Sequence, residues 1–359
     1  MTRRMTAFLV FGITASYADQ LEYTTYRFTD NGESSVYTTG FNLIKTLWTK
    51  TVFLLDIEVD QITVPPLDGI TGASRPQREI ARAFEKNRGQ FIGGVEQGLG
   101  DNTLTSISYY QSREVDYFSQ SVVGTLTRDF AQKNTTIQLK GQYTWDDVGE
   151  IEAATGSLVN AFKEVQQASA TITQLLSPNT VLRIGGDAFH LQGLLSDPYR
   201  LLPDSTRERH PAERWRQAGW AELSHYLRPV DASAVLNYRY YFDDWGVKSN
   251  TATIKLNKYV TSDLIASPEY RYYIQTGADF GKYAQNAPAG TYGTGDYKLR
   301  RFDSNNIGLG LTYFLRGLAA RKSALDFLGG ATVSVMYFRY WNSLRFNADV
   351  VETKIKFGF

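Results

Sequence analysis

Polar and apolar positions alternate with a period of two residues along most of the chain, most clearly at its C-terminal end. This period is typical of a β-strand, because successive side chains point to opposite faces. In a soluble sheet the apolar face would turn toward a core, whereas in an outer-membrane barrel it turns toward lipid and the polar face lines a wet interior. Segment 348–359 places on one face Val351, Thr353, Ile355, Phe357 and Phe359, and on the other Glu352, Lys354 and Lys356.

Sixteen segments share this alternation and are separated by turn residues, so we predict about sixteen strands, within a range of fourteen to eighteen. The connections differ by parity: those after even-numbered segments are mostly short turns, and the four longest all follow odd-numbered segments. Short turns on one side and long loops on the other are the arrangement of membrane barrels. The predicted strands are 20–29, 35–46, 50–62, 88–98, 102–112, 115–130, 134–146, 163–176, 179–192, 214–227, 231–246, 250–261, 264–276, 304–316, 330–342 and 348–359.

The fold class that follows is all-β, a transmembrane antiparallel up-and-down β-barrel. Strands of a soluble sandwich average about 5–6 residues, whereas tilted membrane strands need about 9–11. A propeller, the other soluble alternative, would need a repeated unit that the sequence lacks. Among the connections, 317–329 is expected to form a short helix, and loop 63–87 is expected either to fold into the lumen as a constriction or to pack as an ordinary outer loop.

The first residues predict export. Arg3 and Arg4 precede the apolar run 6–14, and Ser16-Tyr17-Ala18 has the small residues of a cleavage site. We therefore expect a signal peptide over 1–18 and a barrel domain over 19–359. Since no other segment approaches the roughly 20 apolar residues of a membrane helix, the expected location is the bacterial outer membrane.

Composition removes several function classes. The chain has no Cys and only 3 His, which excludes disulfides, thiolate metal sites and cysteine nucleophiles. Its net charge is +1, so no attraction to nucleic acid is expected. No cofactor is predicted either. The 23 Tyr and 20 Phe favour strands over helices.

An arginine flanked by aromatic residues recurs within four odd-numbered segments. If the flanking aromatics point to lipid, each arginine points into the barrel and the four form a ladder on one wall. Such a ladder would bias the selectivity of a pore, unless its members only pair with lumen carboxylates such as Glu222, Asp243 or Glu269. The predicted basic pore-lining residues are Arg27, Arg239, Arg271, Arg339, Lys255, Lys354 and Lys356, reinforced by Arg214 and Arg216, and the predicted acidic ones are Asp56, Glu58 and Asp60.

Two weaker signals concern metal and catalysis. The paired carboxylates Asp146-Asp147 and Asp243-Asp244 lie at the outer ends of strands, where they are weak candidates for a hard cation; hydrated rim charges are the plainer interpretation. His210 lies in an outer loop near the Asp243 hairpin, which leaves an Asp–His hydrolase as a minor alternative. No nucleophile elbow, phosphate loop or zinc-spacing motif is present, so we expect neither a metal site nor an enzyme.

Four segments carry a resemblance to a known family: GITGASRPQRE (69–79), the stretch from His210-Pro211 to Arg216, RYYFDDWGVKSNT (239–251) and EYRYYIQTGADF (269–280). They resemble an uncharacterised bacterial family catalogued as domain of unknown function 3570, over most of the chain from about residue 20. The resemblance implies an outer-membrane barrel of Gram-negative bacteria and carries over no catalytic or ligand residue.

The function expected from the sequence is a pore for small polar or charged solutes. The alternative is a plugged barrel that anchors or scaffolds a periplasmic or surface protein. Expected partners are outer-membrane lipid, lipopolysaccharide and the barrel-assembly machinery, with the terminal Phe359 as the assembly signal.

Overall fold

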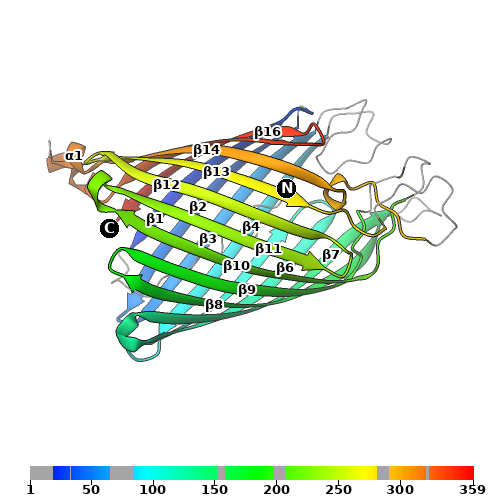
Figure 1. Ribbon diagram of the computed structural model, residues 1–359, viewed down its shortest axis with the longest axis horizontal. Coiled ribbons are helices and arrows are strands. Elements are labelled where there is room, and N and C mark those ends of the chain that lie inside the picture. The colour runs from blue at the N-terminus through cyan, green and yellow to red at the C-terminus, as the bar shows by residue number, and fades with distance from the viewer. Residues whose placement is uncertain are drawn as a thin grey trace.

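Each strand pairs antiparallel with its neighbours in sequence, and β1 pairs with β16, so the sheet closes into a barrel (Figure 1). The computed structural model describes residues 19–32, 34–64, 84–151, 158–197, 202, 207–280, 291–320 and 323–359. The predicted fold class and the sixteen strands are confirmed, with bounds that differ by a few residues.

The strands are β1 (Gln20–Asp30), β2 (Ser35–Trp48), β3 (Thr51–Val64), β4 (Phe84–Gly98), β5 (Thr103–Arg113), β6 (Tyr117–Phe130), β7 (Thr135–Ile151), β8 (Leu158–Ser177), β9 (Thr180–Gly193), β10 (Glu213–Leu227), β11 (Ala232–Asp243), β12 (Lys248–Thr261), β13 (Leu264–Gln275), β14 (Phe302–Phe314), β15 (Thr332–Asn342) and β16 (Asn347–Gly358).

The seam between the first and last strands is continuous. Gln20 lies opposite Gly358 and Asp30 opposite Ala348. Beyond β16, the backbone N–H of Phe359 donates to the carbonyl oxygen of Asp19 at 2.9 Å. Closure leaves no edge strand whose backbone groups would lack partners in lipid.

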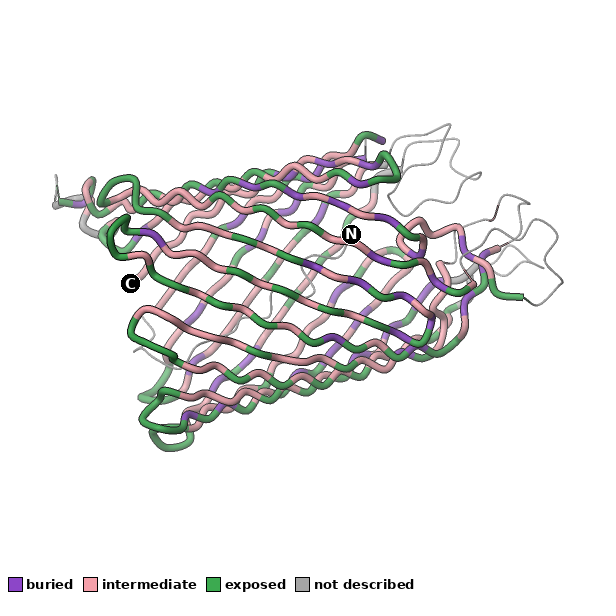
Figure 2. Tube along the Cα trace, viewed as in Figure 1, coloured by how far each residue is buried: buried purple, intermediate pink, exposed green. Residues whose placement is uncertain are grey.

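The two faces of the sheet differ as the alternation predicts. Directly opposed residues of neighbouring strands point to the same side, so the register traces each face around the barrel. The outer face carries the large exposed apolar side chains, among them Ile107 (62%), Ile172 (49%) and Ile254 (50%). The inner face carries most of the buried polar side chains. Figure 2 shows residues of different burial alternating along single strands.

The two ends of the barrel are also different (Figure 1). Short turns and the C-terminus lie at one end, together with α1 (Arg316–Ala319) and the 3-10 helix η4 (Ser323–Leu328). These helices confirm the short helix predicted over 317–329. The longest connections all lie at the opposite end, which we call the outer end.

Some predictions fall on residues that the structure does not describe. The signal peptide 1–18 and residues 65–83 of loop 63–87 lie outside the described residues. Within the described part of the chain, no helix has the length and apolar character needed to cross a membrane.

Candidate functional site

The inner face of β1–β4 is acidic. On β3, the exposed Ile57 and Val59 point outward, which turns Asp56, Glu58 and Asp60 into the lumen as predicted from the alternation. On this wall the lumen-facing carboxylates are Glu22, Asp30, Asp56, Glu58, Asp60 and Glu96, and the lumen-facing cations are Lys86 and Arg88.

The carboxylates of this acidic strip differ in their partners. Asp60 is 1% exposed, pairs with Arg88, and accepts a hydrogen bond from the Thr38 hydroxyl. Asp56 accepts from the Asn42 amide at 3.1 Å, and Glu58 accepts from the Gln90 amide at 3.3 Å. The Asn42 and Gln90 amides are neutral partners, whereas Arg88 carries a charge that offsets that of Asp60.

Two of the four motif arginines face the lumen. Arg239 lies between Tyr238 and Tyr240, whose side chains are 51% and 40% exposed on the outer face. Arg271 lies between the equally outward Tyr270 and Tyr272. The Arg239 guanidinium lies 5.4 Å from the ring centroid of Tyr241, and no carboxylate of the described chain pairs with it.

These arginines lie across the lumen from the acidic strip. In a ring of sixteen strands, β3 and β11 are eight positions apart, which is half the circumference. Arg239, Arg271 and Glu58 each lie seven residues beyond the first residue of their strands, β11, β13 and β3. Since those first residues all follow short turns at the same end, opposite charges meet the lumen at comparable height.

The other two motif arginines lie on the outer face, so the prediction of four inward arginines is wrong. Arg27 is opposed by Tyr37 and Val351, which are 44% and 41% exposed. Arg339 is opposed by Ile307, which is 52% exposed, and by Asp349.

The reason is that the aromatics flanking these two arginines turn inward. Phe28, Phe346, Ala348 and Val350 form a buried apolar cluster on the lumen side of the β15–β16–β1 wall. Tyr26, Phe338 and Tyr340 pack against that cluster. The sequence does contain a signal for the outward direction of Arg339. The turn between β15 and β16 has four residues, so Arg339 lies opposite Asp349, and Asp349 is on the same face of β16 as Val351.

The predicted lysines lie on the lumen face but differ in their surroundings. Lys255 is opposed by Glu269. Lys354 pairs with Glu352 at 3.0 Å and with Glu22 at 3.5 Å, which offsets its charge. Lys356 is opposed by Glu22 in the register.

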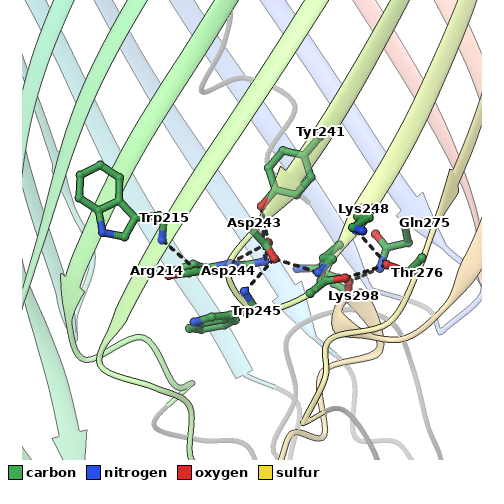
Figure 3. Close-up of polar contacts among 12 residues, drawn as sticks. Arg214, Trp215, Tyr241, Asp243, Asp244, Trp245, Lys248, Gln275, Thr276 and Lys298 are labelled. Carbon is green, nitrogen blue, oxygen red and sulfur yellow. Dashed lines mark hydrogen bonds and ion pairs between the residues drawn. The ribbon is translucent and has the colours of Figure 1, made fainter.

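At the outer rim, Asp243 joins β10 to the turn between β11 and β12 (Figure 3). Its Oδ2 accepts hydrogen bonds from the Arg214 guanidinium and, at 2.6 Å, from the Tyr241 hydroxyl. Its Oδ1 accepts from the backbone N–H groups of Trp245 and Val247 at 3.1 and 2.9 Å. Gly246 completes this turn with φ +84, a conformation that favours glycine.

These contacts account for the carboxylates considered as metal ligands. Both Asp243 oxygens are occupied by donors, and Asp244 Oδ1 accepts from the Trp215 backbone N–H at 3.0 Å. Asp146 faces the lumen and pairs with Lys163 at 2.9 Å, whereas Asp147, the next residue along β7, points to the opposite face. The described residues hold no group of three His, Cys, Asp or Glu side chains placed to share a metal ion.

His210 is enclosed by the rim. Its ring contacts Trp245 and Phe280, with centroids 5.3 and 5.6 Å away, and its Nδ1 lies 3.0 Å from the Leu195 carbonyl oxygen. Its Nε2 lies 3.7 Å from Glu208. The acid near this imidazole is therefore Glu208, and Asp243 is held by Arg214 instead.

Hydrogen bonds join two of the connections at the outer rim. In the β9–β10 connection, Arg209 exchanges backbone hydrogen bonds with Gly293 of the β13–β14 connection, both at 3.0 Å. The buried Glu208 accepts from the Thr294 hydroxyl and the Gly295 N–H at 3.2 Å. Trp245, Val247, Ala278 and Leu299 form an apolar cluster beneath. These contacts hold the two connections together at the outer end of the barrel.

At the opposite end, the predicted assembly residue Phe359 is 64% exposed. Lys45 Nζ lies 5.1 Å from its ring centroid and also pairs with Asp19. This hydrogen bond from Lys45, helped by one from the Thr46 backbone, lowers the pKa of the Asp19 carboxyl. The recognition of Phe359 by an assembly machine stays a prediction.

Sequence reasoning missed the partners that decide which lumen charges persist. The alternation does not single out Arg88 and Glu22, although they offset the charges of Asp60 and Lys354. Arg216, which the sequence predicts only as a reinforcement of the ladder, faces the lumen opposite Asp243, and its Nε has no hydrogen-bond partner within the described structure. Only the cross-strand register identifies such pairs.

Comparison with known proteins supports the fold and supplies no activity. The model of a family described as "Protein of unknown function (DUF3570)" matches residues 70–327. No protein of curated function matches the chain. A bacterial polysaccharide outer membrane secretin aligns with a TM-score of 0.53 at 8% identity, over 96% of this chain and 100% of that one.

Two receptors also align with the chain. The siderophore receptor PirA from Pseudomonas aeruginosa gives a TM-score of 0.47 at 12% identity, over 92% of this chain and 57% of the receptor. PirA from Acinetobacter baumannii gives 0.46 at 12% identity, over 91% and 53%. This chain thus spans little more than half the length of these receptors. Its closed barrel is of the outer-membrane type, a fold consistent with a location in the bacterial outer membrane.

Proposed function

Since the chain belongs to the family of unknown function DUF3570, we propose a function from its lumen: a passive outer-membrane channel for small polar or charged solutes. Selection among solutes falls to the two charged walls. The observation that carries this proposal is the placement of Arg239 and Arg271 across the lumen from Asp56 and Glu58, at comparable height.

Opposed walls of charge act on solutes through a transverse field. A unit charge about 8 Å from an ion changes the energy of that ion by roughly 0.5 kcal/mol even at the dielectric constant of water. Charges of opposite sign on opposite walls add their fields in the space between them. Dipolar solutes are therefore oriented, and ions are drawn to separate sides of the lumen.

Planar-bilayer recording tests the proposal. We expect discrete conductance steps from the purified barrel, because an open lumen admits ions. Reversing both lumen arginines (Arg239→Glu, Arg271→Glu) changes four units of charge, so it should shift the reversal potential in a salt gradient toward cations, by roughly a thirtyfold change in the permeability ratio.

A matched control comes from the two motif arginines on the outer face. Arg27→Glu with Arg339→Glu makes the same change of total charge away from the lumen, so the reversal potential should stay at the wild-type value. An unchanged potential in the lumen variant, or an equal shift in the control, would remove the role of Arg239 and Arg271 in selection.

A plugged barrel that serves as a scaffold is the second candidate. The hydrogen-bonded rim loops favour this candidate, because an ordered surface at the outer end suits contact with a partner protein. Absence of conductance over many insertions would support this candidate and count against the channel. Neither candidate assigns a reaction to the enclosed His210.

A further inference from the structure

Three arginines lie where β1, β15 and β16 reach the outer end: Arg27 and Arg339 on the outer face of the strands, and Arg345 in the adjoining turn. Arg27 and Arg339 each lie three residues below the last residue of their strands. Arg345 is exposed in the turn between β15 and β16, where it adopts φ +62. The Asn31 side chain donates to the Arg345 carbonyl oxygen at 3.0 Å, which holds this turn against the turn after β1.

Among the described residues, a carboxylate neutralises one of these three charges. Arg339 pairs with Asp349, and its Nη2 donates to Asn347 Oδ1 at 2.9 Å. Asp349 also accepts from the Tyr337 hydroxyl at 2.6 Å. Within the described chain, Arg27 and Arg345 have no carboxylate partner.

The arginine cluster lies at the height of the membrane interface. Arg27 is opposed by Tyr37, and Arg339 has outward Tyr337 and Trp341 two residues to either side along β15. Outward aromatic residues mark the boundary between hydrocarbon and headgroups. Since an unpaired cation on the lipid face is costly within hydrocarbon and tolerated at the interface, this position calls for an anionic partner from the membrane.

We propose that Arg27, Arg339 and Arg345 bind the phosphorylated headgroup of an outer-leaflet lipid. Guanidinium groups suit this ligand, because their planar N–H donors match phosphate oxygens in pairs. Asp349 holds Arg339 in place and leaves the cluster net positive. This site depends on the location of the barrel in the outer membrane and is independent of what passes through its lumen.

Lipid binding to the purified, delipidated barrel tests the site. The probes are lipid A, which carries two phosphates on a glycolipid, and phosphatidylcholine, which is zwitterionic, each titrated in detergent and followed by native mass spectrometry. We expect lipid A to be retained in preference to phosphatidylcholine. The double variant Arg27→Gln, Arg345→Gln should bind lipid A roughly 30-fold more weakly, about fivefold for each arginine.

Arg128→Gln is the matched control. Arg128 is an exposed arginine near the opposite end of the barrel, with its guanidinium 5.6 Å from the Phe130 ring centroid, so lipid A binding should be unchanged. Arg27→Lys keeps the charge and should retain much of the affinity. Heat-modifiable migration in gels confirms that each variant is folded.

Several outcomes would overturn the proposal. Equal lipid A binding by the wild type and the double variant is one, and equal weakening in Arg128→Gln is another. Displacement of lipid A by millimolar inorganic phosphate would indicate a site for free phosphate. A dimer that disappears in the double variant without lipid would indicate contact between two copies of the chain.

Discussion

At the scale of single residues, Asp243 shows how one buried carboxylate can organise the rim. Five donor atoms reach it: Nε and Nη2 of Arg214, the Tyr241 hydroxyl, and the N–H groups of Trp245 and Val247. The Arg214 guanidinium also lies 4.1 Å from the Trp245 ring centroid (Figure 3). The turn, the cation and the indole therefore depend on one side chain.

We expect Asp243→Ala to lower the free energy of unfolding by about 3 kcal/mol, because it leaves the buried Arg214 without a counter-charge. Urea unfolding followed by tryptophan fluorescence measures the change. Asp263→Ala is the control: it removes the pair with Arg316, whose side chain is 56% exposed, and should cost less than about 1 kcal/mol. Equal losses in the two variants would mean that Arg214 finds another partner.

What the sequence could predict at this scale is the division of each strand into two faces. Which face lies inside follows only where one of them is plainly apolar. In β3 (TVFLLDIEVDQ) one face is plainly apolar, so the sequence predicts that Asp56 and Glu58, on the other face, point into the lumen. Around Arg27 both faces of the strand contain aromatic residues, Tyr23 on one face and Tyr26 with Phe28 on the other. The local pattern therefore does not decide which face points into the lumen.

At the scale of elements, glycines opposed by large aromatic side chains set how closely strands pack on the lumen side. Gly185 of β9 is opposed by Trp220 of β10, and Gly308 of β14 by Phe338 of β15. A Cβ at either glycine would overlap the opposing ring. Aromatic side chains that cover a glycine on the neighbouring strand are a known stabilising device of sheets.

Gly185→Ala should therefore destabilise the barrel by about 1–3 kcal/mol, because the Trp220 indole must move off its position. The displaced ring would project into the lumen, so single-channel conductance should fall as well. Gly219→Ala, next to Trp220 but with open space around its Cβ, should leave both values near the wild type. The measurements are the unfolding midpoint and the conductance step of each variant. Together they decide whether the packing of Trp220 against Gly185 stabilises the barrel.

Element bounds were the most predictable part of this fold, and cross-strand pairs the least. Alternation ends at turn residues such as Ser177-Pro178-Asn179, so strand limits follow from local chemistry. The Gly185–Trp220 contact joins residues on two strands, and its existence depends on register. A one-residue slip would reverse every side chain of a strand.

At the scale of the whole molecule, the number of strands decides which charges face each other. With sixteen strands, β3 lies opposite β11; with fourteen or eighteen, the same sequence would turn the acidic strip toward other neighbours. The charge separation is thus a property of closure, and it exists only because β1 meets β16 in register.

If the two walls act as one field, neutralising the acidic wall should have the opposite effect to reversing the basic one. We expect Asp56→Asn with Glu58→Gln to shift the reversal potential toward anions, by roughly a fivefold change in permeability ratio, because each lost charge contributes about 0.5 kcal/mol. Asp349→Asn, which removes an acid from the outer face, is the control and should leave the potential unchanged. Neutralising both walls together should return the ratio close to the wild-type value, since sites separated by the lumen act additively. A shift toward cations in the acidic-wall variant would mean that a different surface sets ion preference.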